Sequence, residues 1–424
     1  MNSEEVFVSL DIGTSSVKTV IGEMNDGSLN VIGVGEAEST GIKKGSIVDI
    51  DATVRSIRRA IEEAERMVGL TIRSVIVGIS GNHIHLRPCH GIVAVSNENH
   101  EIGDTDIGRV ISAAQVMSIP PEREIIDVIP QQFIVDGVDE IHDPRGMIGV
   151  RLEMDGTLIT GSKTVLHNLL RCVEKSGLQV ADICLQTLAV SSVALTEDEK
   201  NLGVVLVDIG GGSTSVAVFD QGTLVSTFEL PVGGNHMTKD VSIIKKIPLE
   251  EAEKLKIQHG AAMPEATSPE DRFTASRIGS SKKQTLDQVD LAEIIEARLG
   301  ELFDIVREEL RRIGVSDPAG GYVLTGGVTA MPGVADLAAE KLGTNVRIAA
   351  PDYIGVREPK FTACIGLIQF AYHNVKIQGK EVAAAVAEDR YPDEPKPRKQ
   401  KRSAPKDKQG VTARVKSWFN MFFD

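Results

Sequence analysis

A short motif that occurs twice constrains the fold more than any other feature of the chain. One apolar run leads into DIGTSS at residues 11–16, and a second leads into DIGGGS at residues 208–213. A strand that ends in Asp and turns through Gly and small residues exposes backbone N–H groups that can converge on an anion. One such turn is usually an ordinary hairpin, but two copies predict two homologous halves that each carry a phosphate-binding turn.

The residues of these turns have separate expected roles. A side chain larger than Ser at Gly13 or Gly211 would keep the backbone away from phosphate oxygens. The carboxylates of Asp11 and Asp208 can each hold a hydrated Mg²⁺, and Lys18 adds positive charge to the first turn. The pair of turns therefore predicts a site for a phosphorylated ligand and Mg²⁺.

A third glycine turn lies near the end of the second half. Residues 322–328, YVLTGGV, form an expected strand that runs into Gly326 and Gly327, with a helix expected around Gly333 to Leu342. Glycine at this turn would let an adenosine ring lie against the backbone. The chain has neither a G-x-x-x-x-G-K-[ST] loop nor a strand followed by G-x-G-x-x-G, so the P-loop and Rossmann classes have no support.

The pattern around the turns is that of an α/β protein. Consecutive hairpin strands are expected at Val6–Leu10, Ser16–Gly22 and Leu29–Val34. A helix from Asp51 is expected to end at Gly69, and the segment 82–162 has strand and helix signals of its own, which predict an inserted subdomain. Residues 260–285 are polar and weakly patterned, and a long amphipathic helix is expected after them.

Composition bounds the class of protein. The net charge of −14 argues against general nucleic-acid binding. The four cysteines are scattered without C-x-x-C spacing, so reduced and mostly buried thiols are expected. No apolar run approaches the ~18 residues of a spanning helix, and the N-terminus lacks the features of a signal peptide, so a cytosolic location is expected.

The C-terminal tail differs from the rest of the chain. Residues 390–416 contain ten Lys or Arg against three acidic residues, and residues 389–409 read as a disordered basic linker. In residues 410–424, GVTARVKSWFNMFFD, one apolar stripe follows helical spacing. Its members are Val411, Val415, Trp418, Phe419 and Phe422. Such a helix is typical of the interface of an anionic membrane, and the alternative is docking on the protein's own core or in a partner's groove.

The three motifs, taken in order, resemble those of the actin, Hsp70 and sugar-kinase superfamily, whose members bind ATP between two domains. Within it the chain most closely resembles the FtsA family of bacterial cell-division proteins. The resemblance rests on SLDIGTSSVK, KKGSIVDID, GSKTVLHNLLRCVEKSGL, LTEDEKNLGVVLVDIGGGST, EAEKLKIQHG and LTGGV. It implies an actin-like (ribonuclease H-like) two-domain ATPase fold with an FtsA-type inserted subdomain and a C-terminal amphipathic helix.

The resemblance also implies a division into subdomains. Subdomain 1A comprises residues 1–81, 163–207 and 355–388, and the inserted subdomain 1C comprises 82–162. Subdomain 2A comprises 208–232 and 302–354, and 2B comprises 233–301, followed by the linker 389–409 and the membrane-targeting helix 410–424.

The family's nucleotide contacts can be placed residue by residue. By that resemblance Asp11 and Asp208 organise Mg²⁺, and the phosphates of ATP contact Gly13, Thr14, Ser15, Lys18, Gly210, Gly211, Gly212 and Ser213, with Gly233 and Gly234 completing the cradle. Glu253 and Lys256 match positions that grip ribose and adenine, although their spacing alone also fits a solvated charged face. Gly326 and Gly327 would support adenosine. Gln186 matches the position that orients water, and because an amide cannot act as a base, at most slow ATP hydrolysis is expected.

The function implied by the resemblance is that of an adaptor. Such a protein polymerises on the cytoplasmic face of the membrane at the division site, anchors FtsZ polymers through the FtsZ C-terminal tail and recruits later division proteins. The inserted subdomain would contact the next protomer, and the FtsZ tail would dock around residues 233–298. The alternative is a soluble kinase or phosphatase of the same superfamily, which explains the turns but neither the insertion nor the tail.

Overall fold

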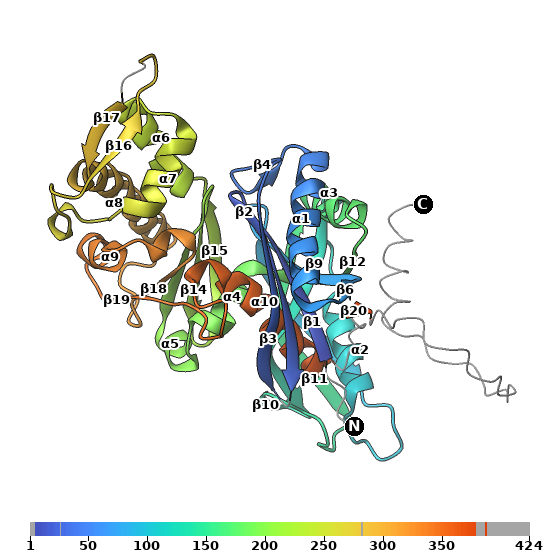
Figure 1. Cartoon of the computed structure of the whole chain (residues 1–424). Coiled ribbons are helices and arrows are strands. Elements are labelled where there is room, and N and C mark those ends of the chain that lie inside the picture. The colour runs from blue at the N-terminus through green and yellow to red at the C-terminus, as the bar shows by residue number, and fades with distance from the viewer. Residues whose placement is uncertain (1–4, 26, 281–282, 379–385, 388–424) are drawn as a thin grey trace, which may run out of the picture.

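The computed structural model describes residues 5–25, 27–280, 283–378 and 386–387. The linker at 389–409 and the amphipathic helix at 410–424 lie outside these described residues. Figure 1 shows two lobes side by side, and each is built around a sheet with helices packed against it. We call the lobe that begins at the N-terminus the first half and the other lobe the second half.

The first half is built on a five-stranded sheet in the order β12-β7-β1-β2-β3. Its strands are β1 (Glu5–Ile12), β2 (Ser16–Asn25), β3 (Ser28–Glu38), β7 (Ser74–Ile79) and β12 (Gln179–Leu185). The expected hairpins are confirmed, since β1 pairs antiparallel with β2 and β2 with β3. Parallel strands β7 and β12 complete the sheet.

Helices cover both faces of this sheet. Helices α1 (Ile50–Val68) and α3 (Lys163–Lys175) pack on one face, and α10 (Thr362–Gln378) packs on the other. Asp49 caps the start of α1 by accepting a hydrogen bond from the amide of Ala52, and Gly69 ends it with a φ of 69°. The helix predicted from Asp51 to Gly69 is therefore confirmed.

The second half repeats the sheet of the first, strand for strand. Its order is β15-β14-β13-β18-β19. The strands are β13 (Val204–Ile209), β14 (Thr214–Asp220), β15 (Thr223–Leu230), β18 (Tyr322–Thr325) and β19 (Val346–Ile348). Antiparallel β13, β14 and β15 correspond to β1, β2 and β3, and parallel β18 and β19 correspond to β7 and β12. The two homologous halves predicted from the repeated motif are thus present.

A helical region stands on the second half between β15 and β18. It consists of α6 (Gly234–Lys245), α7 (Leu249–His259), the hairpin β16 (Arg272–Ser276) and β17 (Lys283–Asp287), and the start of α8 (Gln288–Arg312). The long amphipathic helix is confirmed as α8, and α9 (Val334–Leu342) follows the third glycine turn as expected. The hairpin lies within or beside the polar segment 260–285, where no strand was expected, because only Ala275 and Leu286 point firmly into the core.

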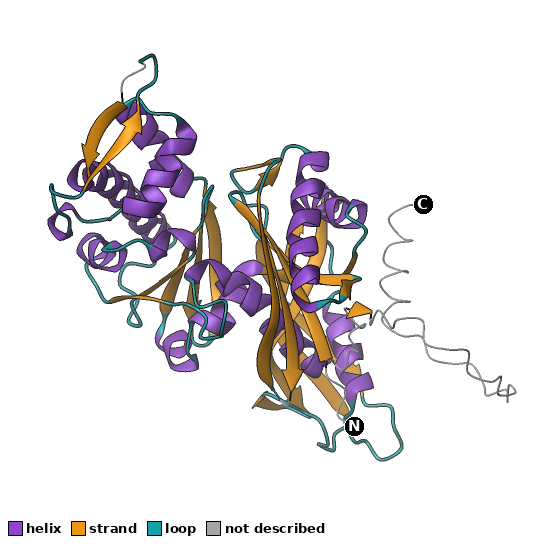
Figure 2. Ribbon diagram, viewed as in Figure 1, coloured by secondary structure: helices purple, strands orange, loops and turns teal. Residues whose placement is uncertain are grey.

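The inserted subdomain is a four-stranded antiparallel sheet in the order β10-β9-β11-β8 with one helix across it (Figure 2). Its elements are β8 (His85–Ala94), α2 (Asp104–Ala114), β9 (Arg123–Val135), β10 (Val138–Ile141) and β11 (Arg151–Ser162). Side chains of α2 and of the sheet bury a separate apolar core that includes Ile107, Phe133 and Met154. The insertion leaves the first half after β7 and returns directly into α3.

The halves share an apolar contact at the helices that connect them. Helix α4 (Gln186–Ala194) packs on α10, and its Val190 and Ala194 join a buried cluster with Leu206 and Ala217 of the second sheet.

Short elements complete the fold: β4 (Ile42–Lys43), β5 (Ser46–Ile47), β6 (Thr71–Ile72), α5 (Glu197–Leu202), β20 (Val386–Ala387), and 3-10 helices at Pro264–Ala266, Gly327–Ala330 and Pro359–Phe361. The four cysteines are free and buried, as expected. In the described part of the chain no helix has both the length and the apolar character needed to span a bilayer.

Candidate functional site

The first turn joins β1 to β2 and holds a buried ion pair. Asp11 and Lys18 lie opposite each other in the two strands, with Lys18 Nζ 3.3 Å from Asp11 Oδ2. Both residues are buried, at 7% and 8% exposed. Burial alone would lower the pKa of Lys18, but the neighbouring acidic groups, led by Asp11 and joined by Glu36, together outweigh burial and the pKa is raised. The first half therefore supplies its own cation beside its carboxylate.

The second turn joins β13 to β14 and lacks such a partner. The residue opposite Asp208 is Ser215. Burial, together with the negative charge of Asp11, raises the pKa of Asp208 to about 7, and Lys18 offsets only part of this. A carboxyl group of this kind either holds a proton near neutral pH or binds a divalent cation that compensates its charge.

The two turns meet across the boundary between the halves. The side chain of Ser15 lies against Gly211, where an added Cβ would overlap the Ser15 hydroxyl. Thr14 lies against Gly212, where an added Cβ would be 2.5 Å from Thr14 Oγ1. The Ser15 hydroxyl also donates to Asn235 Oδ1 at 3.1 Å. Glycines of the second turn thus receive the side chains of the first.

The backbone of these turns fits an anionic ligand. Among the described residues, the amides of Thr14, Ser15, Gly211 and Gly212 donate no backbone hydrogen bond. Unpaired amides beside glycines are the donors that phosphate oxygens accept from in phosphate-binding turns. Because Thr14 and Ser15 occupy the space in front of Gly211 and Gly212 in this structure, a polyphosphate requires the two turns to move apart.

Gly233 and Gly234 begin α6 directly behind the second turn. The amide of Gly234 donates to Gly210 O at 3.0 Å, and the amide of Asn235 donates to Gly211 O at 2.7 Å. A Cβ on Gly233 would lie 2.5 Å from the same Gly210 oxygen. The start of α6 is therefore part of the second turn, and its glycines allow that close approach.

Glu253 and Lys256 of α7 face α6. Lys256 Nζ donates to Glu253 Oε2 at 2.7 Å, to Thr238 Oγ1 at 2.8 Å and to Gly234 O at 3.1 Å. Lys256 is 8% exposed, so the alternative of a solvated charged face is wrong for this residue. The pair connects α7 to the α6 start behind the second turn.

The third glycine turn lies against the second. Gly326 has a φ of +93°, and an added Cβ would be 2.6 Å from Ile209 O and would overlap Asp208 Oδ1. Gly327 is more open, since an added Cβ would be 3.7 Å from Lys360 Cβ. Glycine is required at 326 by both the backbone conformation and the close approach of Asp208.

Gln186 contacts Asp11 and shares a small pocket with Asp208. As the first residue of α4, it places Nε2 3.4 Å from Asp11 Oδ1. It also lines a small pocket with Thr187, Val190, Leu206, Asp208 and Ser215. The position reached by counting back from Asp208 along the sequence is thus brought next to both turns.

Three residues at this boundary were not anticipated from the sequence: Asn82, Glu229 and Asn235. Glu229 is partly buried between the halves, and this desolvation raises its pKa, while its carboxylate hydrogen-bonds Ser213 of the second turn. Asn82 bonds to the backbone of Glu229. Only Asn235 carried a usable signal, because it directly follows the glycine pair 233–234.

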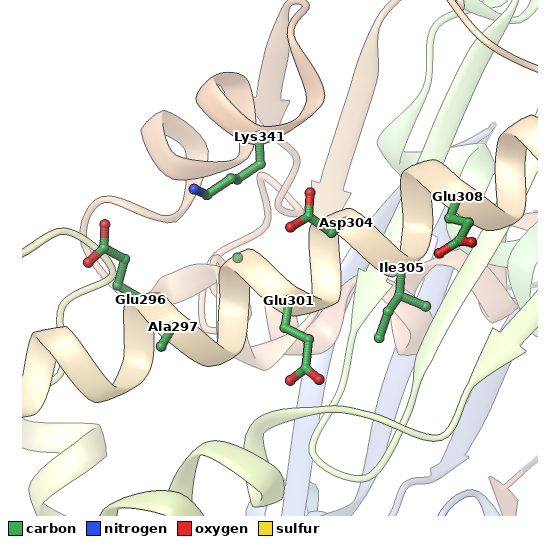
Figure 3. Close-up of a pocket in the computed structure, with 8 residues that line it drawn as sticks. Glu296, Ala297, Glu301, Asp304, Ile305, Glu308 and Lys341 are labelled. Carbon is green, nitrogen blue, oxygen red and sulfur yellow. The ribbon is translucent and has the colours of Figure 1, made fainter.

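A separate groove of about 550 Å³ lies between α8 and α9, away from the turns. Figure 3 shows Lys341 reaching from α9 toward α8, and carboxylates of Glu296, Glu301, Asp304 and Glu308 projecting from α8. Such an acidic lining repels phosphate, and the groove has none of the glycine turns described above. The groove therefore does not compete with the turns as the candidate site.

Comparison with known proteins identifies the family of this chain. The model of the family "Cell division protein FtsA" matches residues 205–366, and that of the "SHS2 domain inserted in FTSA" matches residues 81–160. The FtsA protein of Bacillus subtilis is 57% identical over 389 residues, which cover 92% of this chain and 88% of that protein. That of Enterococcus faecalis is 40% identical with 99% of both chains covered, and that of Escherichia coli is 36% identical with 86% and 90% covered.

Solved structures with low sequence identity share the fold. The PilM–PilN type IV pilus biogenesis complex aligns with a TM-score of 0.57 at 17% identity, covering 85% of this chain and 97% of that one. MreB5 of Spiroplasma citri bound to ADP aligns with a TM-score of 0.53 at 14% identity, covering 88% and 97%. With these actin-like neighbours, two repeated halves and an SHS2 insertion, the chain belongs to the FtsA family of cell division proteins.

Proposed function

We propose that this FtsA-family protein binds Mg-ATP between its halves, polymerises on the cytoplasmic face of the membrane and anchors FtsZ polymers at the division septum, where it recruits later division proteins. The observation that carries the proposal is the facing pair of turns, with amides on both that donate no backbone hydrogen bond, the buried Asp11 at the base of one turn and the partly buried Asp208 at the base of the other. That arrangement suits a polyphosphate with a divalent cation.

The nucleotide would be held by residues of both halves. Amides around Gly13–Ser15 and Gly210–Ser213 would hold the phosphates, with Lys18 adding charge and Gly233 and Gly234 completing the cradle. Asp11 and Asp208 would hold Mg²⁺ through water, and the bound cation would neutralise phosphate charge. Glu253, Lys256, Gly326 and Gly327 border the space proposed for adenosine.

Hydrolysis would be slow. Gln186 can orient a water near Asp11 through its amide, but it cannot remove the proton, and general-base assistance commonly contributes ~10² to 10⁴ in rate. ATP would then act mainly as a ligand that fixes the relative position of the halves. Turnover at the rate of a metabolic kinase would contradict this part of the proposal.

Polymerisation and partner docking would use surfaces outside the turns. The actin-like MamK double helical filament aligns with a TM-score of 0.50 at 13% identity, which supports a filament-forming fold, and the insertion would contact the next protomer. For the FtsZ tail, the region 233–298 offers exposed apolar side chains on α6, α7 and the loop after β16. These are Ile243, Ile244, Leu249, Ile257 and Ile278.

Attachment to the membrane would come from the tail. The stripe Val411, Val415, Trp418, Phe419 and Phe422 would enter the interface, and the basic linker would attract anionic lipid. One short helix is a weak anchor, so stable attachment would depend on several copies in one polymer. Polymerisation and membrane binding would therefore reinforce each other.

Co-sedimentation with anionic liposomes tests this function. The intact chain is compared with a chain truncated after Gly410, each with and without Mg-ATP and FtsZ. We expect only the intact chain to pellet, ATP to increase the pelleted fraction, and FtsZ to pellet only in its presence. Trp418→Glu should release the protein, whereas Asn420→Glu adds the same charge outside the stripe and should have a smaller effect. If neither chain pellets, a soluble kinase or phosphatase of the same fold becomes the better hypothesis.

A further inference from the structure

The side chain of Asn82 pairs with the backbone of Glu229 across the boundary between the halves. Asn82 Nδ2 donates to Glu229 O at 2.7 Å, and the amide of Glu229 donates to Asn82 Oδ1 at 2.7 Å. Glu229 lies on β15, which is the edge strand of the second sheet. An edge strand leaves N–H and C=O groups unpaired, and here a side-chain amide of the first half satisfies one such pair.

Glu229 of β15 also links the second turn to the first half through its side chain. The Glu229 carboxylate hydrogen-bonds Ser213, the last residue of the DIGGGS motif. Its two oxygens lie beside Gly45 and Gly81 of the first half, where an added Cβ would be 2.7 Å from Oε1 and 3.3 Å from Oε2, respectively. Movement of the second turn away from the first half must therefore disturb Glu229.

On the other side, Asn82 stands where the chain enters the insertion. The next residue, His83, accepts a hydrogen bond from the amide of Ser162 at its Nδ1 atom, at 3.3 Å. Its carbonyl accepts from Arg123 Nη2 at 2.8 Å, and the same Arg123 nitrogen donates to Thr160 O at 2.8 Å. Through its neighbour His83, Asn82 is therefore tied to the place where the chain leaves the insertion and to the strands β9 and β11.

We infer that Asn82 holds the two halves together and connects the second glycine turn to the base of the inserted subdomain. We call this contact of Asn82 with Glu229 the clasp, and residues 82–83 and 160–163, where the chain enters and leaves the insertion, the insertion root. If the halves separate, either the two hydrogen bonds between Asn82 and the Glu229 backbone break or the insertion root moves with β15. In both cases a change at the turns alters the insertion root. The clasp itself is independent of any ligand, whereas its response to nucleotide rests on the ATP binding proposed above.

The insertion contains a matched control. Asn97 makes the same kind of reciprocal contact with the backbone of Glu101, whose amide donates to Asn97 Oδ1 at 2.9 Å while Asn97 Nδ2 donates to Glu101 O. Both asparagines are exposed, so replacing either removes little packing. Asn82→Ala breaks a contact between the halves, and Asn97→Ala breaks an equivalent contact inside one subdomain.

Hydrogen exchange of the intact chain, read by mass spectrometry on the wild type and both variants, tests the clasp. Without nucleotide, we expect Asn82→Ala to speed exchange roughly tenfold or more in segments 223–230 and 160–163, since two hydrogen bonds are lost. Asn97→Ala should speed exchange only near residues 97–101. Equal exchange of segment 223–230 in all three proteins would overturn the clasp.

Addition of Mg-ATP then tests the coupling. We expect wild-type protein to change its exchange both at residues 208–213 and at the insertion root, and Asn82→Ala to change only at residues 208–213. A root that responds equally in Asn82→Ala would overturn the coupling. If Mg-ATP alters no segment in any protein, the proposed nucleotide binding fails, while the clasp is still judged from the nucleotide-free measurement.

Discussion

The two glycine turns that meet at the boundary between the halves have the same backbone plan but opposite chemistry. In the first, Asp11 faces Lys18 and the turn carries the side chains of Thr14 and Ser15; in the second, Asp208 faces Ser215 and the turn carries Gly211 and Gly212. One half provides a cation and protruding side chains, and the other provides an uncompensated carboxyl group and the space to receive them. The repeat therefore builds complementary halves rather than equivalent ones.

This difference explains why the site would need a divalent cation. Lys18 pairs with Asp11, and burial of Asp208, together with the negative charges of Asp11 and Glu229, raises the pKa of Asp208. A bound Mg²⁺ would remove that cost and would also attract phosphate. Each of the following experiments changes one side of the comparison.

Loss of the cation of the first turn should have the largest effect. We expect Lys18→Met to lower the free energy of unfolding by about 3 kcal/mol and to abolish ATP binding, because it leaves Asp11 buried without its partner. Chemical denaturation and binding of a fluorescent ATP analogue measure the two effects. Lys200→Met is the control, since Lys200 pairs with the exposed Glu197 and should change stability by less than about 0.5 kcal/mol.

The double variant Lys18→Met with Asp11→Asn sharpens this result. Removing both charges should restore most of the stability but not ATP binding. Equal stability of wild type and Lys18→Met would mean that the ion pair is not what compensates Asp11.

Filling the glycine of the second turn should have an intermediate effect. Gly211→Ala puts a methyl group where the Ser15 hydroxyl lies, and we expect a loss of about 1–2 kcal/mol with a lower thermal transition. Ser15→Gly in the same chain should recover much of the loss by opening the space. As a control, Gly108→Ala in α2 adds a methyl group that meets nothing within 4 Å, and it should be neutral or slightly stabilising. Failure of Ser15→Gly to recover stability would contradict the interlocking of the turns.

The smallest effect is expected for the pH dependence of the free energy of unfolding that Asp208 causes. Burial raises the pKa of Asp208 to about 7 in the folded protein, well above the ordinary value of an aspartate, so the folded state holds the proton more tightly than the unfolded state. Its contribution to stability is fully present below about pH 4 and is lost as pH rises through 7. We expect Asp208→Asn to remove about 1 kcal/mol of this dependence between pH 6 and 7.

The same proton should compete with Mg²⁺. In the wild type, Mg²⁺-dependent ATP binding should strengthen as pH rises through 7, because the cation replaces the proton on Asp208. Titrations at several pH values measure this. An unchanged Mg²⁺ affinity between pH 6 and 8 would show that Asp208 is not the group that titrates.

Much of the site could be predicted from the sequence because its main elements are local. An apolar strand followed by Asp and Gly specifies each turn within a few residues, and the seven-residue offset from Asp11 to Lys18, repeated from Asp208 to Ser215, even carries the asymmetry of the halves. The roles proposed for the nucleotide-binding residues remain predictions. The structure adds that the turns touch each other directly.

The rest depended on contacts that no local pattern reveals. Asn82 and Glu229 are 147 positions apart in the sequence. Nothing in the sequence around an exposed Asn indicates that it binds an edge strand of the other half. Hairpin β16–β17 was missed because its strands bury few apolar residues. In the insertion, β8 begins as early as His85 because β11 pairs with it back to that residue, and the bounds of such a strand depend on its partner.

The way the insertion is attached has an evolutionary consequence. His85 and Thr160 pair directly across β8 and β11, so the chain enters and leaves the insertion at one point, and the insertion has a core of its own. Elements joined in this way can be gained, lost or exchanged without redesign of their host, because a short loop could close the gap. The SHS2 unit can therefore be inserted or removed as one module. By this route the actin-like fold could acquire a new surface without any change to the five-stranded sheet of the first half.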